Sequence, residues 1–191
     1  MPRRKGPSLD RQQVVAAAIA CIEADGPAAL AITPVARRLG IKPPSLYNHV
    51  KGADDLALAV LIEANHRMVA TMRAGIGGVY EPRAVLAALA ASLRQFALAN
   101  PGLYQTISQI PPQNDHPELG PLIFEVLDFF RRPLAQLGIT GDEAIHAIRA
   151  LRSAMHGFVL LETSGQFGLG QSTDESYSWL VQTTLRGLEA R

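Results

Sequence analysis

The chain of 191 residues contains one cysteine, Cys21. A single cysteine excludes an intrachain disulfide and the paired thiolates of a cysteine zinc site. Scarce cysteine is typical of proteins that stay in a reducing compartment, and we therefore expect a cytoplasmic protein. The basic residues Arg3, Arg4 and Lys5 precede an apolar run at 14–22, as in a secretory signal. Charged and amide side chains interrupt that pattern and no small-residue cleavage pattern follows, so secretion is not expected.

Long apolar runs are also missing. Although 48% of the residues are hydrophobic, no uncharged apolar stretch approaches the roughly 18 residues that a membrane span needs. We therefore expect a substantial apolar core and no membrane partner. The apolar and polar alternation of a β-strand is absent as well, whereas alanine and leucine are abundant. The sequence thus predicts an all-α fold.

The usual signatures of catalysis and cofactor binding are missing. No serine lies in a Gly-x-Ser-x-Gly elbow. The glycine-rich segment 165–170 follows no strand and precedes no Lys-Ser/Thr pair, so it predicts a loop rather than a phosphate-binding site. We expect no catalytic residue, no metal and no cofactor. The histidines show neither metalloprotease spacing nor a paired-cysteine partner; they are His49, His66, His116, His146 and His156.

Proline and glycine divide the chain into helical segments. Ser8 is a candidate N-cap for the first helix, with Asp10 in its first turn, and Gly26 ends that helix. Thr33, followed by Pro34, is a candidate start for a short second helix. A proline inside a later helix, Pro133, should kink or shorten it. The predicted helices span about 8–25, 33–39, 43–49, 54–74, 82–100, 103–109, 117–137, 142–164 and 173–189.

Charge is distributed unevenly along the chain. Residues 1–51 carry eight Lys or Arg and three acidic side chains, whereas the remainder carries ten basic and fourteen acidic ones. Residues 1–7 are basic, and we expect them to form a flexible arm. A basic N-terminal part on an acidic body suits a polyanionic partner at one end, although an ordinary charged surface would look the same. We place a domain boundary at Gly52, which gives the domains 1–52 and 53–191.

Two short helices joined by Leu39-Gly40-Ile41 follow a longer helix, which is the organisation of a helix-turn-helix. Glycine permits the left-handed backbone that such a turn requires. In this motif the second helix enters the DNA major groove while the first crosses the backbone. A double-stranded DNA operator is therefore the expected partner. The side chains available to meet it are Lys42, Ser45, Tyr47, Asn48, His49 and Lys51.

Residues 30–56, LAITPVARRLGIKPPSLYNHVKGADDL, resemble the recognition segment of the tetracycline-repressor (TetR) family. An Ala-x-x-Leu-Gly-Ile pattern begins at Ala36, and a Ser-Leu-Tyr-x-His-Val run begins at Ser45, at the spacing that is typical of the family. The resemblance implies an N-terminal three-helix DNA-binding domain. It also implies a larger C-terminal helical bundle for ligand binding and dimerisation.

The resemblance assigns roles to individual residues. Tyr47, His49 and Lys51 match positions that meet phosphates, whereas the positions near base edges or backbone are matched by Lys42, Pro44, Ser45 and Asn48. Many members carry threonine where Ala31 stands; here Thr33 is expected to cap the second helix and is kept as a DNA-contact candidate. Many also carry lysine where Ala53 stands. The DNA-binding candidates are Thr33, Lys42, Pro44, Ser45, Tyr47, Asn48, His49 and Lys51.

The segment 151–162 resembles a subgroup with a Trp-His-Gly signature in its penultimate helix, although Met155 stands in place of the tryptophan. The resemblance implies that this helix and the last one pair across a homodimer axis, with Gly157 allowing close approach. An unknown small-molecule effector is expected between the C-terminal helices. The candidate lining residues are Met72, Tyr104, Phe124, Met155, Phe158 and Trp179.

Taken with these features, the resemblance implies a ligand-responsive transcriptional repressor that binds a palindromic operator as a homodimer. Two alternatives stay open on the sequence alone. One is an activator of the same fold, and the other is a helical small-molecule-binding protein that does not bind DNA.

Overall fold

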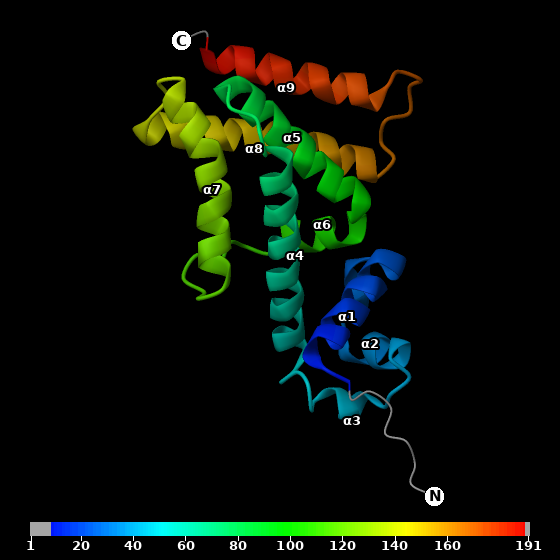
Figure 1. Ribbon diagram of the computed structural model, residues 1–191. Helices are drawn as coiled ribbons and strands as arrows, with labels where there is room; N and C mark the ends of the chain where they lie inside the picture. The colour runs from blue at the N-terminus through cyan, green and yellow to red at the C-terminus, as the bar shows by residue number, and fades with distance from the viewer. Residues whose placement is uncertain (1–8, 190–191) are drawn as a thin grey trace, which may run out of the picture. The chain divides into compact units, whose positions relative to one another are not determined.

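The computed structural model describes residues 9–189, and the regular elements among them are all helices (Figure 1). The all-α prediction is confirmed. The basic arm predicted at 1–7 and the cap predicted at Ser8 lie outside the described residues. Among residues 9–189, none of the helices combines the length and the low polarity that a membrane span requires. The helices are α1 (Arg11–Asp25), the 3-10 helix η1 (Pro27–Ala29), α2 (Ile32–Arg38), α3 (Pro43–Leu46), α4 (Ala53–Gly75), α5 (Pro82–Ala99), α6 (Pro101–Ser108), α7 (Leu119–Gln136), α8 (Gly141–Thr163) and α9 (Thr173–Glu189).

The chain forms two compact units. The first contains the described residues up to Ala64 together with Gly102–Ile110, and the second contains Asn65–Pro101 and the described residues from Pro111 onward. The domain boundary predicted at Gly52 falls at the start of α4, whereas the first unit continues through the first half of that helix. Most of α6 also belongs to the first unit, although α5 and α7 belong to the second.

A capping box starts α1. The Asp10 carboxylate accepts the Gln13 backbone N–H at 2.8 Å, and the Gln13 side chain accepts the Asp10 N–H at 2.9 Å. These bonds satisfy N–H groups that have no partner inside a helix. Asp10 therefore occupies the cap position, and its predicted place in the first turn is wrong. Gln13 lies three residues after Asp10, which is the spacing that a capping box requires.

The predicted threonine cap of the second helix is also wrong. The helix α2 begins at Ile32, and its N-cap residue Ala31 makes no side-chain hydrogen bond. Thr33 is consequently the second residue of the helix. Pro34 is its third residue, where a backbone N–H would have no intrahelical partner, so proline removes no bond there.

The core of the first unit is assembled from several helices. Val35, Leu46 and Val50 of the helix-turn-helix region are buried, whereas Leu39 and Ile41 are half-buried. Val35 belongs to α2 and Leu46 to α3, and both helices are too short to be stable alone, so the burial of these side chains holds α2 and α3 in place. The fully buried apolar side chains of this unit include Val14, Ala18, Ile22, Val35, Ala36, Leu46 and Leu56.

The start of α6 is attached to α1 within the first unit. The Glu23 carboxylate accepts the backbone N–H groups of Gly102 at 3.1 Å and Leu103 at 2.9 Å, which caps the helix. Glycine is required at 102, because a Cβ there would lie 2.5 Å from the Ile22 carbonyl oxygen. The charge of Glu23 also suits a helix N-terminus.

In the second unit, α5 packs against α7, α8 and α9, and α8 packs against α9 (Figure 1). Pro133 lies inside α7 and is buried, but the helix continues to Gln136. Near its C-terminal end, α7 loses one backbone bond at this proline without ending there. The core of the unit includes Met72, Leu86, Leu89, Leu134, Leu151, Met155 and Leu185.

Candidate nucleic-acid interface

The turn between α2 and α3 has the predicted geometry. Gly40 has a φ of +68°, a left-handed conformation that side chains other than glycine adopt with strain. The N–H of Gly40 donates to the Arg37 carbonyl at 3.1 Å, and that of Ile41 donates to the Ala36 carbonyl at 3.0 Å. These bonds satisfy carbonyls at the end of α2 and fix where α3 begins.

The helix α3 is shorter than predicted and is followed by turns. It ends at Leu46, and residues 47–50 are held by bonds such as that from the His49 N–H to the Leu46 carbonyl at 2.9 Å. Leu46 and Val50 face inward and are buried. The segment between them therefore presents its remaining side chains outward from a base of two apolar anchors.

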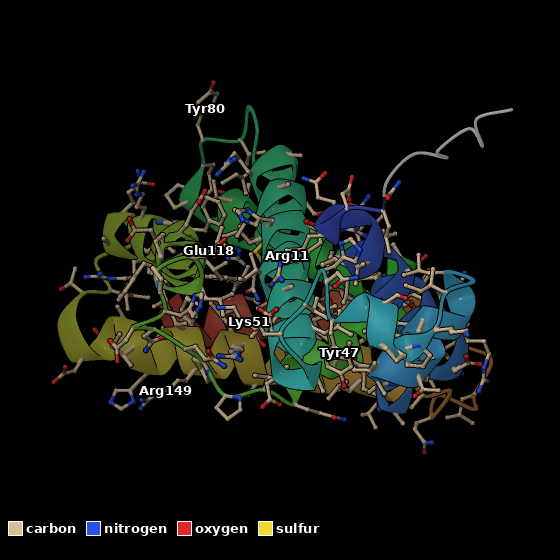
Figure 2. All side chains as sticks on the ribbon, turned by 90° about the horizontal axis from the view of Figure 1, so that it is seen from below. Arg11, Tyr47, Lys51, Tyr80, Glu118 and Arg149 are labelled. Atoms are coloured by element: carbon tan, nitrogen blue, oxygen red, sulfur yellow. The ribbon has the colours of Figure 1, made fainter. Side chains whose placement is uncertain are left out.

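The structure leaves nearly all the predicted DNA-contact side chains accessible. Tyr47 is 56% exposed, so its ring is accessible to a partner. His49 is half-buried. Figure 2 labels Tyr47 and Lys51 in a view from below. The other exposed candidates are Thr33, Lys42, Pro44, Ser45, Asn48 and Lys51.

Further positive charge lies at the end of α2. Arg37 and Arg38 are exposed in its last turn, where they interact favourably with the helix dipole. Together with Lys42 and Lys51 they give this part of the first unit several exposed cations. Such a set can meet a polyanion, because phosphate contacts supply most of the sequence-independent affinity for DNA.

Sequence reasoning missed one group of contacts, which surrounds Asp55 in the first turn of α4. Its Oδ2 and Oδ1 accept hydrogen bonds from Nη1 and Nη2 of Arg11 at 2.9 and 2.8 Å. Oδ2 also accepts the Lys51 backbone N–H at 2.8 Å. Arg11 Nη1 additionally donates to the His49 carbonyl at 3.0 Å. We call Arg11 and Asp55 the interhelical clamp.

The pKa of Asp55 lies well below its ordinary value. The largest cause is the hydrogen bonding from Arg11, and the second is the backbone hydrogen bond from Lys51. The carboxylate is therefore ionised throughout the neutral range. The acidic residue at the start of α4 was a visible signal. Its partner was not, because Arg11 lies 44 residues earlier in the chain.

The predicted effector-lining residues do not share one environment. Met72 and Met155 are buried in the second unit, and Phe158 is half-buried there, with its ring centroid 4.7 Å from that of Phe167. Tyr104 is buried in the first unit. Phe124 and Trp179 are 58% and 67% exposed, so they do not line the interior of a single chain. Residue type alone did not reveal that these two rings face outward.

Groups of three or more His, Cys, Asp or Glu side chains that could hold a metal ion do not occur among residues 9–189.

Comparisons with known proteins agree with this geometry. Residues 86–184 match the family model described as the tetracyclin repressor-like C-terminal domain. The uncharacterized HTH-type transcriptional regulator Rv0681 of Mycobacterium tuberculosis is 32% identical over 96% of this chain and 83% of its own length. The uncharacterized HTH-type transcriptional regulator YobS of Bacillus subtilis is 26% identical over 94% of this chain and 93% of its own length.

Solved structures show the same fold. BioQ with its double-stranded DNA operator superposes with a TM-score of 0.72 at 23% identity, over 96% of this chain and 100% of that chain. A single-residue variant of TetR from Acinetobacter baumannii AYE in complex with minocycline gives 0.73 at 21% identity, over 95% and 93%.

The exposed helix-turn-helix and the helical second unit define an HTH-type transcriptional regulator. The chain belongs to the TetR family of these regulators. The family is not enzymatic, so the prediction that this protein is not an enzyme is confirmed.

Proposed function

We propose that this protein is a homodimeric repressor that binds a palindromic operator and releases it when a small molecule binds the second unit. The observation that carries the proposal is the exposed polar segment from Lys42 to Lys51, supported on buried Leu46 and Val50 beside a glycine turn. This is the arrangement by which a helix-turn-helix presents side chains to the major groove.

The DNA contacts divide into two kinds. Tyr47, His49 and Lys51 are proposed to meet phosphates, which position the protein without reading sequence. Asn48 is proposed to read a base, because an amide can bond both polar atoms of an adenine edge. Thr33, at the second position of α2, is retained as a phosphate contact, since the first helix of the motif crosses the backbone. Lys42, Pro44 and Ser45 complete the proposed interface.

Substitutions in this segment test the assignment. Tyr47→Ala and Lys51→Ala should weaken binding to all DNA sequences by similar factors, because phosphate contacts carry no sequence information. Asn48→Ala should instead relax preference at one position per half-site, by about 1–3 kcal/mol for a bidentate contact. Gel shifts with operator and with single-base variants measure both effects. If Asn48→Ala weakens all sequences alike, Asn48 does not read a base.

The proposed operator has two-fold symmetry. Two identical reading heads in a dimer require two identical half-sites, about one or more helical turns apart. Footprinting on the DNA upstream of the protein's own gene should therefore protect a palindrome, and a scrambled fragment of equal length should show no protection. A single asymmetric footprint contradicts the dimeric mode of binding, and equal binding to both fragments contradicts specific recognition.

Repression is the proposed direction of control. A promoter fused to a reporter should become more active when the gene is deleted, because the bound dimer would obstruct transcription. Lower activity after deletion indicates an activator of the same fold.

The proposed homodimer forms through α8 and α9. Trp179 is 67% exposed on α9, and Leu161 is 47% exposed on α8. A contiguous apolar patch on a protein surface marks an interaction site, and we propose that these two side chains contribute to such a patch. Gly157 is exposed on α8 as well, and a Cβ there would meet nothing within 4 Å. The same helix carries Met155-His156-Gly157, from which we propose membership of the Trp-His-Gly subgroup.

The response to an effector is proposed to use the buried apolar side chains Met72, Met155 and Phe158 of the second unit. Helix α4 runs from the first unit into the second, and α6 returns to the first, where Glu23 caps it. A ligand that favours one arrangement of these connections would shift the population of dimers that fit the operator. The minocycline complex of the TetR variant supports a small-molecule effector of this general kind.

A further inference from the structure

We infer that Arg11 and Asp55 are positioning residues for operator binding, which hold the segment 47–51 in the conformation that meets DNA. The inference rests on the proposed DNA-binding function. It adds two residues that lie outside the recognition segment's own contact set: Arg11 in the first turn of α1 and Asp55 in the first turn of α4.

The segment needs such support because its helix is short. The helix α3 ends at Leu46, so the residues proposed to contact DNA beyond it lie in turns rather than in a helix. Only a few backbone bonds hold these turns, including the bond from the Asn48 N–H to the Ser45 carbonyl at 3.4 Å. Side chains that bond to an irregular backbone satisfy its polar groups and add to the order that the buried anchors Leu46 and Val50 provide.

The interhelical clamp bonds this backbone at two points. Arg11 Nη1 donates to the His49 carbonyl at 3.0 Å, and Asp55 Oδ2 accepts the Lys51 N–H at 2.8 Å. The two side chains are joined by a bidentate pair at 2.8 and 2.9 Å. A planar guanidinium bound to a carboxylate through two parallel bonds also fixes the relative orientation of the two groups. The segment is thereby fixed to the starts of both α1 and α4.

The clamp contributes more to position than to stability. The side chains of Arg11 and Asp55 are 48% and 21% exposed, so solvent screens their attraction. The unit keeps its apolar core of Val14, Leu46 and Leu56 without them. Loss of the clamp should therefore leave the unit folded while the turns at 47–51 become mobile.

Asp55→Asn separates this role from simple electrostatics, because the two predict opposite signs. Removing a negative charge near DNA should tighten binding if charge alone matters. Loss of positioning should instead weaken operator binding by roughly ten-fold, the equivalent of one charge-assisted hydrogen bond. Asp54→Asn is the matched control, because exposed Asp54 is the adjacent carboxylate in the same helical turn. It should bind as tightly as the wild type or more tightly.

Arg11→Gln and the double variant complete the test. Loss of one cation that touches a phosphate lowers the slope of log K against log salt by about 0.9. A positioning role predicts that Arg11→Gln weakens binding with an unchanged slope, and that Arg11→Gln with Asp55→Asn binds no more weakly than Asp55→Asn alone. Asp55→Glu, which keeps the carboxylate, should recover part of the affinity.

Amide hydrogen exchange supplies a readout that needs no DNA. In Asp55→Asn the Lys51 amide should exchange faster, because its acceptor is weakened, whereas amides in α5 and α8 should be unchanged. Circular dichroism reports whether each variant is folded. Binding by Asp55→Asn that equals or exceeds the wild type, or unchanged exchange at Lys51, overturns the inference. Failure of the wild type to bind any DNA refutes the proposed function instead. The two failures can be distinguished, because the exchange experiment reports on the clamp without DNA.

Discussion

Gly157→Leu should convert the protein from dimers to monomers and remove operator binding with them. Gly157 lies on an exposed stretch of α8, and a Cβ built there meets nothing within 4 Å. A single chain therefore has room for a side chain to begin at this position. In a dimer packed through this helix, two-fold symmetry brings the added side chain into the interface from both protomers. Overpacking of about 1–3 kcal/mol per copy would then oppose association twice.

Trp179→Ala, a substitution on α9, should also weaken the dimer and operator binding. A large aromatic side chain that is 67% exposed in one chain becomes an anchor when a partner buries it. Ala135→Leu is the matched control, because Ala135 is an exposed position on α7 that also gains a bulky apolar side chain. It should leave the dimer intact.

Light scattering gives the mass of each variant, and circular dichroism gives its helix content. One half-site provides only part of the operator contacts, so monomers should bind weakly at concentrations where the wild type saturates. A Gly157→Leu protein that is dimeric and binds normally shows that the interface lies elsewhere. Specific DNA binders typically have dissociation constants of about 10⁻⁸ M or less. If the wild type is still monomeric at concentrations on the order of tens of micromolar, far above these values, the two-headed mechanism is refuted.

The helices themselves could be predicted well, because proline, glycine and polar caps interrupt the apolar periodicity. The prediction of 173–189 for the last helix matches α9, and the proline at 82 begins α5 as expected. The helix-turn-helix could be predicted as well, because Gly40 and the spacing of the apolar residues around it indicate a tight turn between two short helices. These features depend on neighbours within a few residues, which the sequence displays.

Caps were harder to predict, because several residues compete for the same role. Ser8, Asp10 and Thr33 all have suitable side chains, but only a structure reveals which backbone N–H groups lie within reach. Asp10 caps α1 with the help of Gln13, whereas α2 begins before Thr33. Local chemistry thus indicates that a helix starts nearby without identifying its first residue.

Contacts between distant segments were the least predictable part of the candidate site. The pairing of Arg11 with Asp55 and the capping of α6 by Glu23 join residues 44 and about 80 positions apart. Outward-facing Trp179 and Phe124 could not be distinguished from core aromatics by residue type. Periodicity gives the faces of a helix, but the neighbour that covers each face depends on tertiary packing.

Arg94→Ala should destabilise the second unit strongly. The Arg94 guanidinium donates from Nε and Nη2 to both carboxylate oxygens of Glu162 at 2.7 and 2.6 Å, and Nη2 lies 2.7 Å from Asp174 Oδ1. It also lies 5.2 Å from the ring centroid of Tyr177, whose hydroxyl donates to the Ala90 carbonyl at 2.8 Å. These contacts join α5, α8 and α9.

The size of the effect follows from burial. The side chains of Arg94 and Glu162 are only 13% and 11% exposed, so removing the arginine leaves a poorly solvated carboxylate without its counterion. Breaking a fully buried pair typically costs about 3–5 kcal/mol, and residual exposure here lowers the expectation to about 2–4 kcal/mol. Arg132→Ala is the control, because its pair with Asp128 is largely exposed and should contribute less than about 1 kcal/mol.

The loss should shrink as the pH falls. In the wild type the hydrogen bonds from Arg94 lower the pKa of Glu162, so the stability that this carboxylate contributes is present above its unfolded pKa and is lost as pH falls through the folded value. Without Arg94, burial should raise the pKa of Glu162, and protonation on acidification then removes the unpaired charge. Urea unfolding, followed by circular dichroism at fixed protein concentration, measures the free energy of unfolding of the wild type and of Arg94→Ala. The difference between these two free energies should be smaller at pH 5 than at pH 7. Adding Glu162→Gln to Arg94→Ala should restore part of the lost stability. A destabilisation of Arg94→Ala no larger than that of Arg132→Ala, or one independent of pH, would show that this ion pair does not hold the three helices together.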